Sequence, residues 1–245
     1  MRTWTTTLIL LGFALATPLS SADALSQTAE QKCRKMRLDA SAKYLGCQYK
    51  TFAKIYSTSY FPDWERSIGR CHMAYQGTWA KLQATPSLAG SSCTEPRFVD
   101  NGDGTVTDNL TGLVWEKKTD DGGLHDKDDL YSFSTGSPWK DDGTIFTTFL
   151  PALNGGSFGG SQGWRLPSAA ELATILLAAY PCNLGQCIDP IFGPVRSTSY
   201  ATTTSPPSPP TQPQDLWWVS FHNGGVDYYH VKDAGLPVRA VRGGL

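Results

Sequence analysis

A ten-residue segment near the middle of the chain, residues 163–172 (GWRLPSAAEL), constrains the fold more than any other stretch. Ser168 is followed three residues later by Glu171, the spacing of a capping box at the start of a helix. A stripe of apolar residues then recurs at helical spacing, namely Leu172, Ile175, Leu176 and Ala179. Pro181 cannot continue a helix. The segment therefore predicts a helix from Ser168 to just before Pro181 that packs on a core.

The first 24 residues have the pattern of a secretory signal peptide. Arg2 precedes an apolar run over residues 8–16, and Ala22-Asp23-Ala24 fits a small-x-small cleavage site. The apolar run is too short to span a bilayer, and no later segment is apolar enough to do so. We expect cleavage after Ala24 and an exported protein, periplasmic or extracellular. With 40% hydrophobic and 18% charged residues, the remainder is expected to fold.

Charge divides the mature chain into two units. Residues 25–92 carry ten Lys/Arg against four Asp/Glu, a net charge of +6, whereas residues 93–245 carry ten against seventeen, a net charge of −7. Residues 27–57 have helical composition, and a second helix is expected from about residue 63 to 84 after a break that ends at Pro62. The sequence thus predicts two units, a basic αα-hairpin (25–92) and an acidic domain (93–245), whose opposite charges allow them to dock on each other.

Six cysteines in an exported chain indicate three disulfides. If the hairpin turns near residue 59, Cys47 and Cys71 face each other, and Cys33 and Cys93 close its base. Cys182 and Cys187 bracket a short loop and are expected to pair with each other. The alternative, a zinc site, requires a tight CxxC-type spacing that is absent. A two-helix unit has too small a core to be stable alone, so disulfides are physically reasonable.

Short β-rich runs with turn residues between them predict antiparallel strands in the second unit. Residues 97–116 contain Asp-Asn-Gly-Asp-Gly and Asn-Leu-Thr-Gly turns. A calcium loop that starts at Asp100 is the alternative, but its positions 1, 3 and 5 hold Asp, Gly and Gly, so a hairpin is favoured. Further strands are expected at Trp164–Leu166, 196–203 and 236–242, a partly helical stretch at 146–153, and an exposed polyproline-like loop at 205–213.

Residues 216–231 predict a β-hairpin that turns at Asn223-Gly224-Gly225. Strand alternation places Trp217, Val219 and Phe221 on one face and Trp218, Ser220 and His222 on the other. We expect Trp217 and Phe221 to lie in the core.

The segment 117–143 is acidic and loop-like. Clustered carboxylates can bind a hard cation such as calcium, and the candidate ligands are Asp120, Asp121, Asp126 and Asp128. The alternative is that these residues form turns on a solvated face. No cofactor is expected otherwise.

Several ordered motifs resemble the Lcl C-terminal domain family over about residues 95–244. They are the run 97–115, the Trp-Arg-Leu-Pro-x-x-x-Glu-Leu segment, the Trp-x-Val-x-Phe strand, the closing Val-Arg-x-Val-Arg, and His125-Asp126-Lys127-Asp128. The resemblance implies an α+β, C-type-lectin-like fold with a twisted antiparallel sheet and at least one packed helix. It also implies glycan binding and a distant relation to formylglycine-generating enzymes. The net charge of −7 is expected to disfavour anionic sugars.

We therefore hypothesise a non-catalytic protein that binds a glycan or another surface ligand. The candidate residues lie on the aromatic hairpin: Trp218, His222, Asn223, Asp227 and Tyr229. An alternative is a structural or interaction protein that uses the basic helical hairpin. An enzyme is the third hypothesis, but no Ser/His/Asp order or HExxH motif is visible, and no motif indicates nucleic-acid binding. The sequence leaves the oligomeric state open.

Overall fold

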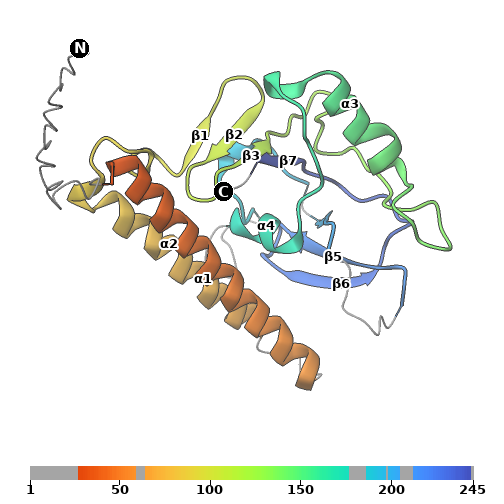
Figure 1. Cartoon of the computed structure of the whole chain (residues 1–245). Coiled ribbons are helices and arrows are strands. Elements are labelled where there is room, and N and C mark those ends of the chain that lie inside the picture. The colour runs from red at the N-terminus through yellow and green to blue at the C-terminus, as the bar shows by residue number, and fades with distance from the viewer. Residues whose placement is uncertain (1–26, 59–63, 177–185, 197, 205–211, 244–245) are drawn as a thin grey trace, which may run out of the picture.

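The computed structural model describes residues 27–58, 64–176, 186–196, 198–204 and 212–243. The expected signal peptide and Cys182 lie outside the described residues, as does most of the proline-rich loop. A long helix pair lies beside a compact body of strands and short helices (Figure 1). None of the helices in the described ranges is long and apolar enough to cross a membrane.

The helix pair has the predicted elements and disulfides. α1 spans Ala29–Thr58 and α2 spans Trp64–Gln83. α1 begins where Thr28 and Gln31 exchange side chain-to-backbone hydrogen bonds, of 3.1 and 2.9 Å, which is a capping box. Disulfides join Cys33 to Cys93 and Cys47 to Cys71, with Cα–Cα distances of 5.7 and 5.8 Å. Both predicted pairings are confirmed. Cys187 is also disulfide-bonded.

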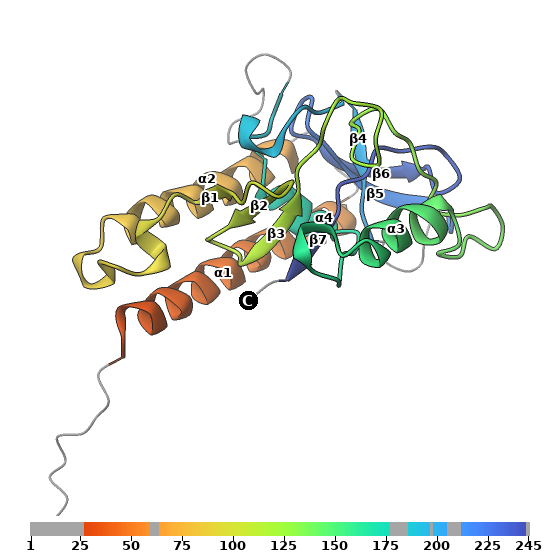
Figure 2. The same cartoon turned by 90° about the horizontal axis from the view of Figure 1, so that it is seen from above.

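The body contains two antiparallel sheets with short helices, which confirms the α+β class. The first sheet has the order β1-β2-β3-β7 and the second the order β4-β5-β6. Their bounds are β1 Phe98–Asp100, β2 Thr105–Asp108, β3 Leu113–Glu116, β4 Ser199–Ala201, β5 Asp215–Ser220, β6 Val226–His230 and β7 Val241–Gly243. Seen from above, β1–β3 lie next to the helix pair, and α3 (Leu150–Gly155) lies on the far side of the body (Figure 2).

The turn between β1 and β2 is the predicted hairpin turn. Gly102 and Gly104 have φ values of 76° and 86°, a region that favours glycine. The Asp100 and Asp103 carboxylates accept hydrogen bonds from the backbone N–H two residues later, at 3.0 Å each. These Asx turns engage the acidic side chains in local structure.

Apolar residues of both sheets form two cores. Trp217, Val219 and Phe221 are buried with α4 in one core, as predicted. The other core surrounds α3 and a preceding π-helical turn, Ile145–Phe149, which confirms the helical stretch predicted near 146–153. The hairpin of β5 and β6 also has the predicted position.

The helix after the capping box is shorter than predicted. The capping box of Ser168 and Glu171 is present, but α4 spans only Ala169–Thr174, because Leu176 forms a β-bridge with Ile188. Carbonyls at its end also accept hydrogen bonds from distant residues: Tyr44 Oη donates to Ala173, and Arg97 Nη2 to Thr174. The prediction that the helix continues to Pro181 was therefore wrong, although Leu172, Ile175 and Leu176 are buried.

Three predicted strands are shorter than expected or absent. The strand expected at 196–203 is only β4, Ser199–Ala201. Trp164–Leu166 is not a strand; Arg165 forms an isolated bridge with Val241, with hydrogen bonds of 2.9 Å in both directions. The last strand begins at Val241, not residue 236, because Leu236 pairs separately with Tyr131 and Arg239 is turned into the interior. Tertiary pairing partners, absent from local sequence, set these boundaries.

Arg97 joins the helix pair to the body. Its guanidinium donates to the buried Asp108 carboxylate at 3.1 and 3.2 Å and to the Thr174 carbonyl at 2.7 Å. Its other side lies over the ring of Tyr75, 5.4 Å from the centroid, and Tyr75 stacks on Tyr44 at 4.5 Å. We call this arginine and these two aromatic rings the Arg97 junction. Leu110 of the body, which is buried in the core of the helix pair, and the Cys33–Cys93 disulfide add to the contact between the two units.

We predict that the outer disulfide stabilises the fold more than the inner one. The two close loops with sequence separations of 60 and 24 residues. Loop-closure entropy then predicts losses of about 4 kcal/mol for Cys33→Ala/Cys93→Ala and about 3 kcal/mol for Cys47→Ala/Cys71→Ala. Urea unfolding of both double variants measures the difference. The reverse order would show that loop closure does not determine their contributions.

Candidate functional site

The β5–β6 hairpin carries all five residues predicted to bind a ligand. Its register pairs Trp218 with Asp227 and Leu216 with Tyr229, so strand alternation puts these four positions on one face. The opposite face is buried in one core, and Leu216 on the Trp218 face is buried in the other. β6 is an edge strand of its sheet.

The predicted residues contribute in different ways. Trp218 is half-buried, and His222 is exposed at the turn. Asn223 Oδ1 accepts a hydrogen bond from the Gly225 N–H at 2.9 Å, so this side chain shapes the turn. The side chains of Asp227 and Tyr229 lie outside what the structure describes. A half-buried indole and an exposed imidazole on one hairpin offer an apolar ring and a hydrogen-bonding group to a ligand.

The acidic loop brings together three of the four predicted metal ligands. Carboxylate oxygens of Asp120, Asp126 and Asp128 lie within 4.8 Å of one another. Asp121 is directed to another role, because its Oδ1 accepts hydrogen bonds from Thr119 Oγ1 and the Gly123 N–H, both at 2.9 Å.

A cation already lies within this acidic cluster. Lys127 Nζ is 3.0 Å from Asp120 and 2.5 Å from Asp128. Asp126 accepts backbone N–H bonds of 2.7 and 2.8 Å from Gly122 and Asp128, and these hydrogen bonds lower its pKa. Calcium would have to displace the Lys127 ammonium group. The donor set therefore fits a resident calcium ion poorly.

A buried ionic centre around Glu116 was not predicted from the sequence. Glu116 Oε1 contacts Lys118 Nζ at 2.8 Å and His125 Nδ1 at 2.9 Å, and Oε2 accepts from the Ala240 N–H at 2.9 Å. Arg239 Nη1 donates to the carbonyl oxygens of Glu116 and Phe192, at 2.6 and 3.0 Å.

Burial and ion pairing shift the pKa values of Glu116 and Lys118 in opposite directions. Burial alone would raise the pKa of Glu116, but the Lys118 charge and hydrogen bonds from His125, Lys118 and Ala240 lower it below its ordinary value. Burial lowers the pKa of Lys118, although Glu116 opposes this effect. Burial likewise lowers the pKa of Arg239.

The Glu116 centre positions the loop and strand segments that surround it. It fixes the end of β3, the acidic loop through His125, and the segment before β7 through Ala240. Gly193 permits the close approach of a further segment, because a Cβ there would overlap the Lys118 carbonyl. Two sequence signals were available: Glu-Lys-Lys directly after an apolar strand, and an arginine between apolar residues in Val-Arg-x-Val-Arg.

The comparisons with known proteins identify the family. The model of the Lcl C-terminal domain matches residues 104–242, more than half of the chain. The chain therefore belongs to the Lcl C-terminal domain family, and the resemblance inferred from the motifs is confirmed. The helix pair lies outside the matched region. The comparisons with curated proteins and with solved structures returned no match.

We predict that the Glu116 centre contributes a pH-dependent part of the stability. The folded pKa of Glu116 lies below its ordinary value of 4.5, so its stabilising effect is present at neutral pH and lost as the pH falls through the folded pKa. Glu116→Gln leaves Lys118 buried without its counter-ion and should cost about 3 kcal/mol at pH 7. Chemical denaturation should show this difference narrowing below pH 4. A pH-independent difference would mean that Glu116 contributes by shape alone.

Proposed function

We propose that this protein is a non-catalytic binding protein, exported from the cell, whose C-type-lectin-like domain recognises a glycan or another surface ligand through the β5–β6 hairpin. The observation that carries the proposal is the asymmetry of this hairpin. One face is buried in one core. On the other face Leu216 is buried in the second core, whereas Trp218 is only half-buried and the strand leads to an exposed His222 at the turn.

The side chains on the Trp218 face of the hairpin suit a sugar ligand. The apolar C–H faces of a sugar ring stack on an indole, and hydroxyl groups exchange hydrogen bonds with imidazole, amide and carboxylate groups. The register puts Asp227 opposite Trp218 and places position 229 on the same face. Family membership adds support, because glycan binding is what the Lcl C-terminal domain resemblance implies.

In the proposed binding mode, the protein contacts its ligand directly and does not require a calcium ion. The acidic cluster of Asp120, Asp126 and Asp128 lies on a separate loop, and Lys127 neutralises part of its charge. A ligand held by stacking and hydrogen bonding requires no metal bridge.

A glycan array with the mature protein tests the proposal. We expect Trp218→Ala and Tyr229→Ala each to lower binding of the recognised glycan by about tenfold or more, a loss of about 1.4 kcal/mol. The matched control is Tyr49→Ala, which removes a 70% exposed aromatic ring from α1 and should leave binding unchanged. Thermal unfolding of each variant checks that the fold is retained.

Two outcomes would contradict the proposal. Full binding by folded Trp218→Ala and Tyr229→Ala variants would show that the ligand binds elsewhere than on the hairpin. Loss of binding in a chelator, with the fold intact, would show that a metal bridge is required. We expect binding to persist in the chelator.

A further inference from the structure

α1 presents a row of lysines along one side of the helix. Successive helix positions turn by about 100°, so residues 32, 36, 43, 50 and 54 fall within about 40° of one another. They are Lys32, Met36, Lys43, Lys50 and Lys54. Lys35 lies nearby, and the row is clear of the buried stripe that includes Cys33, Ala40 and Tyr44.

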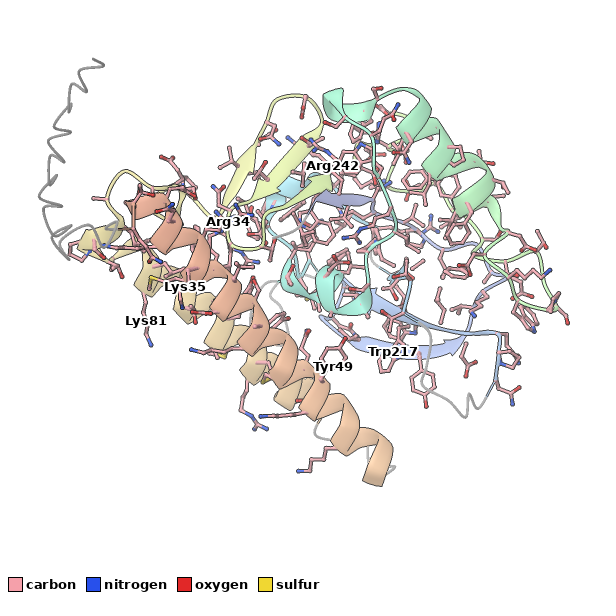
Figure 3. The ribbon with its side chains drawn as sticks, in the orientation of Figure 1. Arg34, Lys35, Tyr49, Lys81, Trp217 and Arg242 are labelled. Carbon is pink, nitrogen blue, oxygen red and sulfur yellow. A yellow bond between two sulfur atoms is a disulfide. The ribbon has the colours of Figure 1, made fainter. Side chains whose placement is uncertain are left out.

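α2 adds Arg70 and Lys81, both exposed. Lys35 and Lys81 lie on the side of the helix pair away from the sheets, whereas Tyr49 lies on the side toward them (Figure 3). Among the side chains described on this surface, Asp39 is the only acid, paired with Lys35 at 2.8 Å. We call this surface the basic face; its cations are Lys32, Lys35, Lys43, Lys50, Lys54, Arg70 and Lys81.

The contacts between the body and the helix pair that the structure describes lie away from the basic face. They are made at the Arg97 junction, where Tyr44 and Tyr75 lie, and by Leu110, which is buried in the core of the helix pair. The row of cations runs from Lys32 to Lys54, and 22 residues of helix span about 33 Å. This row is much longer than a small anion, so it suits an extended, negatively charged partner.

We propose that the basic face binds the surface of a membrane rich in anionic lipids. Charge complementarity supplies the attraction, and two exposed apolar side chains select the kind of partner. Met36 and Met73 are 37% and 57% exposed, and Met36 falls within the row of lysines. At a bilayer interface, lysine ammonium groups contact the headgroups while apolar side chains enter the boundary with the acyl chains. A fully solvated polyanion offers nothing to these methionines. Membrane binding is independent of the proposed ligand site on the β5–β6 hairpin.

Vesicle flotation with the mature full-length chain tests the proposal. Wild-type protein should float with phosphatidylglycerol–phosphatidylcholine vesicles, not with pure phosphatidylcholine, and be released as salt rises from 50 to 500 mM. Lys43→Gln/Lys50→Gln should weaken binding by about 25-fold, since each cation near an anionic bilayer contributes about fivefold. The matched control, Arg34→Gln/Lys140→Gln, makes the same charge change off the basic face and should weaken it less than twofold.

A second arm separates a membrane from a soluble polyanion. Met36→Ser/Met73→Ser should weaken vesicle binding severalfold and leave heparin binding, the probe for a polyanion, unchanged. Equal losses in the lysine variant and its control, binding to neutral vesicles, or binding to heparin without vesicle binding would each overturn the proposal.

Discussion

The Arg97 junction is the contact on which the arrangement of the whole molecule depends. Arg97 lies near the start of the second unit, and its guanidinium contacts a buried carboxylate, a helix-end carbonyl and an aromatic ring of the helix pair. Arginine can do this because its planar group donates in a fixed fork on its edge and stacks through its face. Arg97 also donates to a carbonyl at the end of α4. The junction thereby holds the β5–β6 hairpin and the basic face in one fixed orientation relative to each other.

Much of the fold was predictable because its signals are local or covalent. Disulfide pairing in the helix pair followed from the distance of each cysteine from the turn. The Gly-rich turns fixed the hairpins, and alternation identified the buried face of β5. The end of α4 and the start of β7 were not predictable, because both depend on partners far away in sequence: Arg97 and Tyr44 for α4, and Tyr131 and Arg165 for the segment around β7.

The candidate sites were also predictable where the signal is local in sequence and not where it depends on distant partners. The hairpin position of Trp218, His222 and Asn223 was predicted from the turn signal, but the use of the Asn223 side chain to shape that turn depends on backbone geometry. The approach of Asp120, Asp126 and Asp128 was anticipated from their clustering. The Glu116 centre was missed because Lys118 and Arg239 look like surface residues in a sequence, and only the packed structure shows the carboxylate that offsets their burial.

Differential scanning calorimetry of the mature chain tests most directly whether the Arg97 junction makes the two units one. We expect a single transition for the wild type, with equal calorimetric and van't Hoff enthalpies, and two resolved transitions for Arg97→Ala. Two independent transitions in the wild type, unchanged by Arg97→Ala, would contradict this expectation.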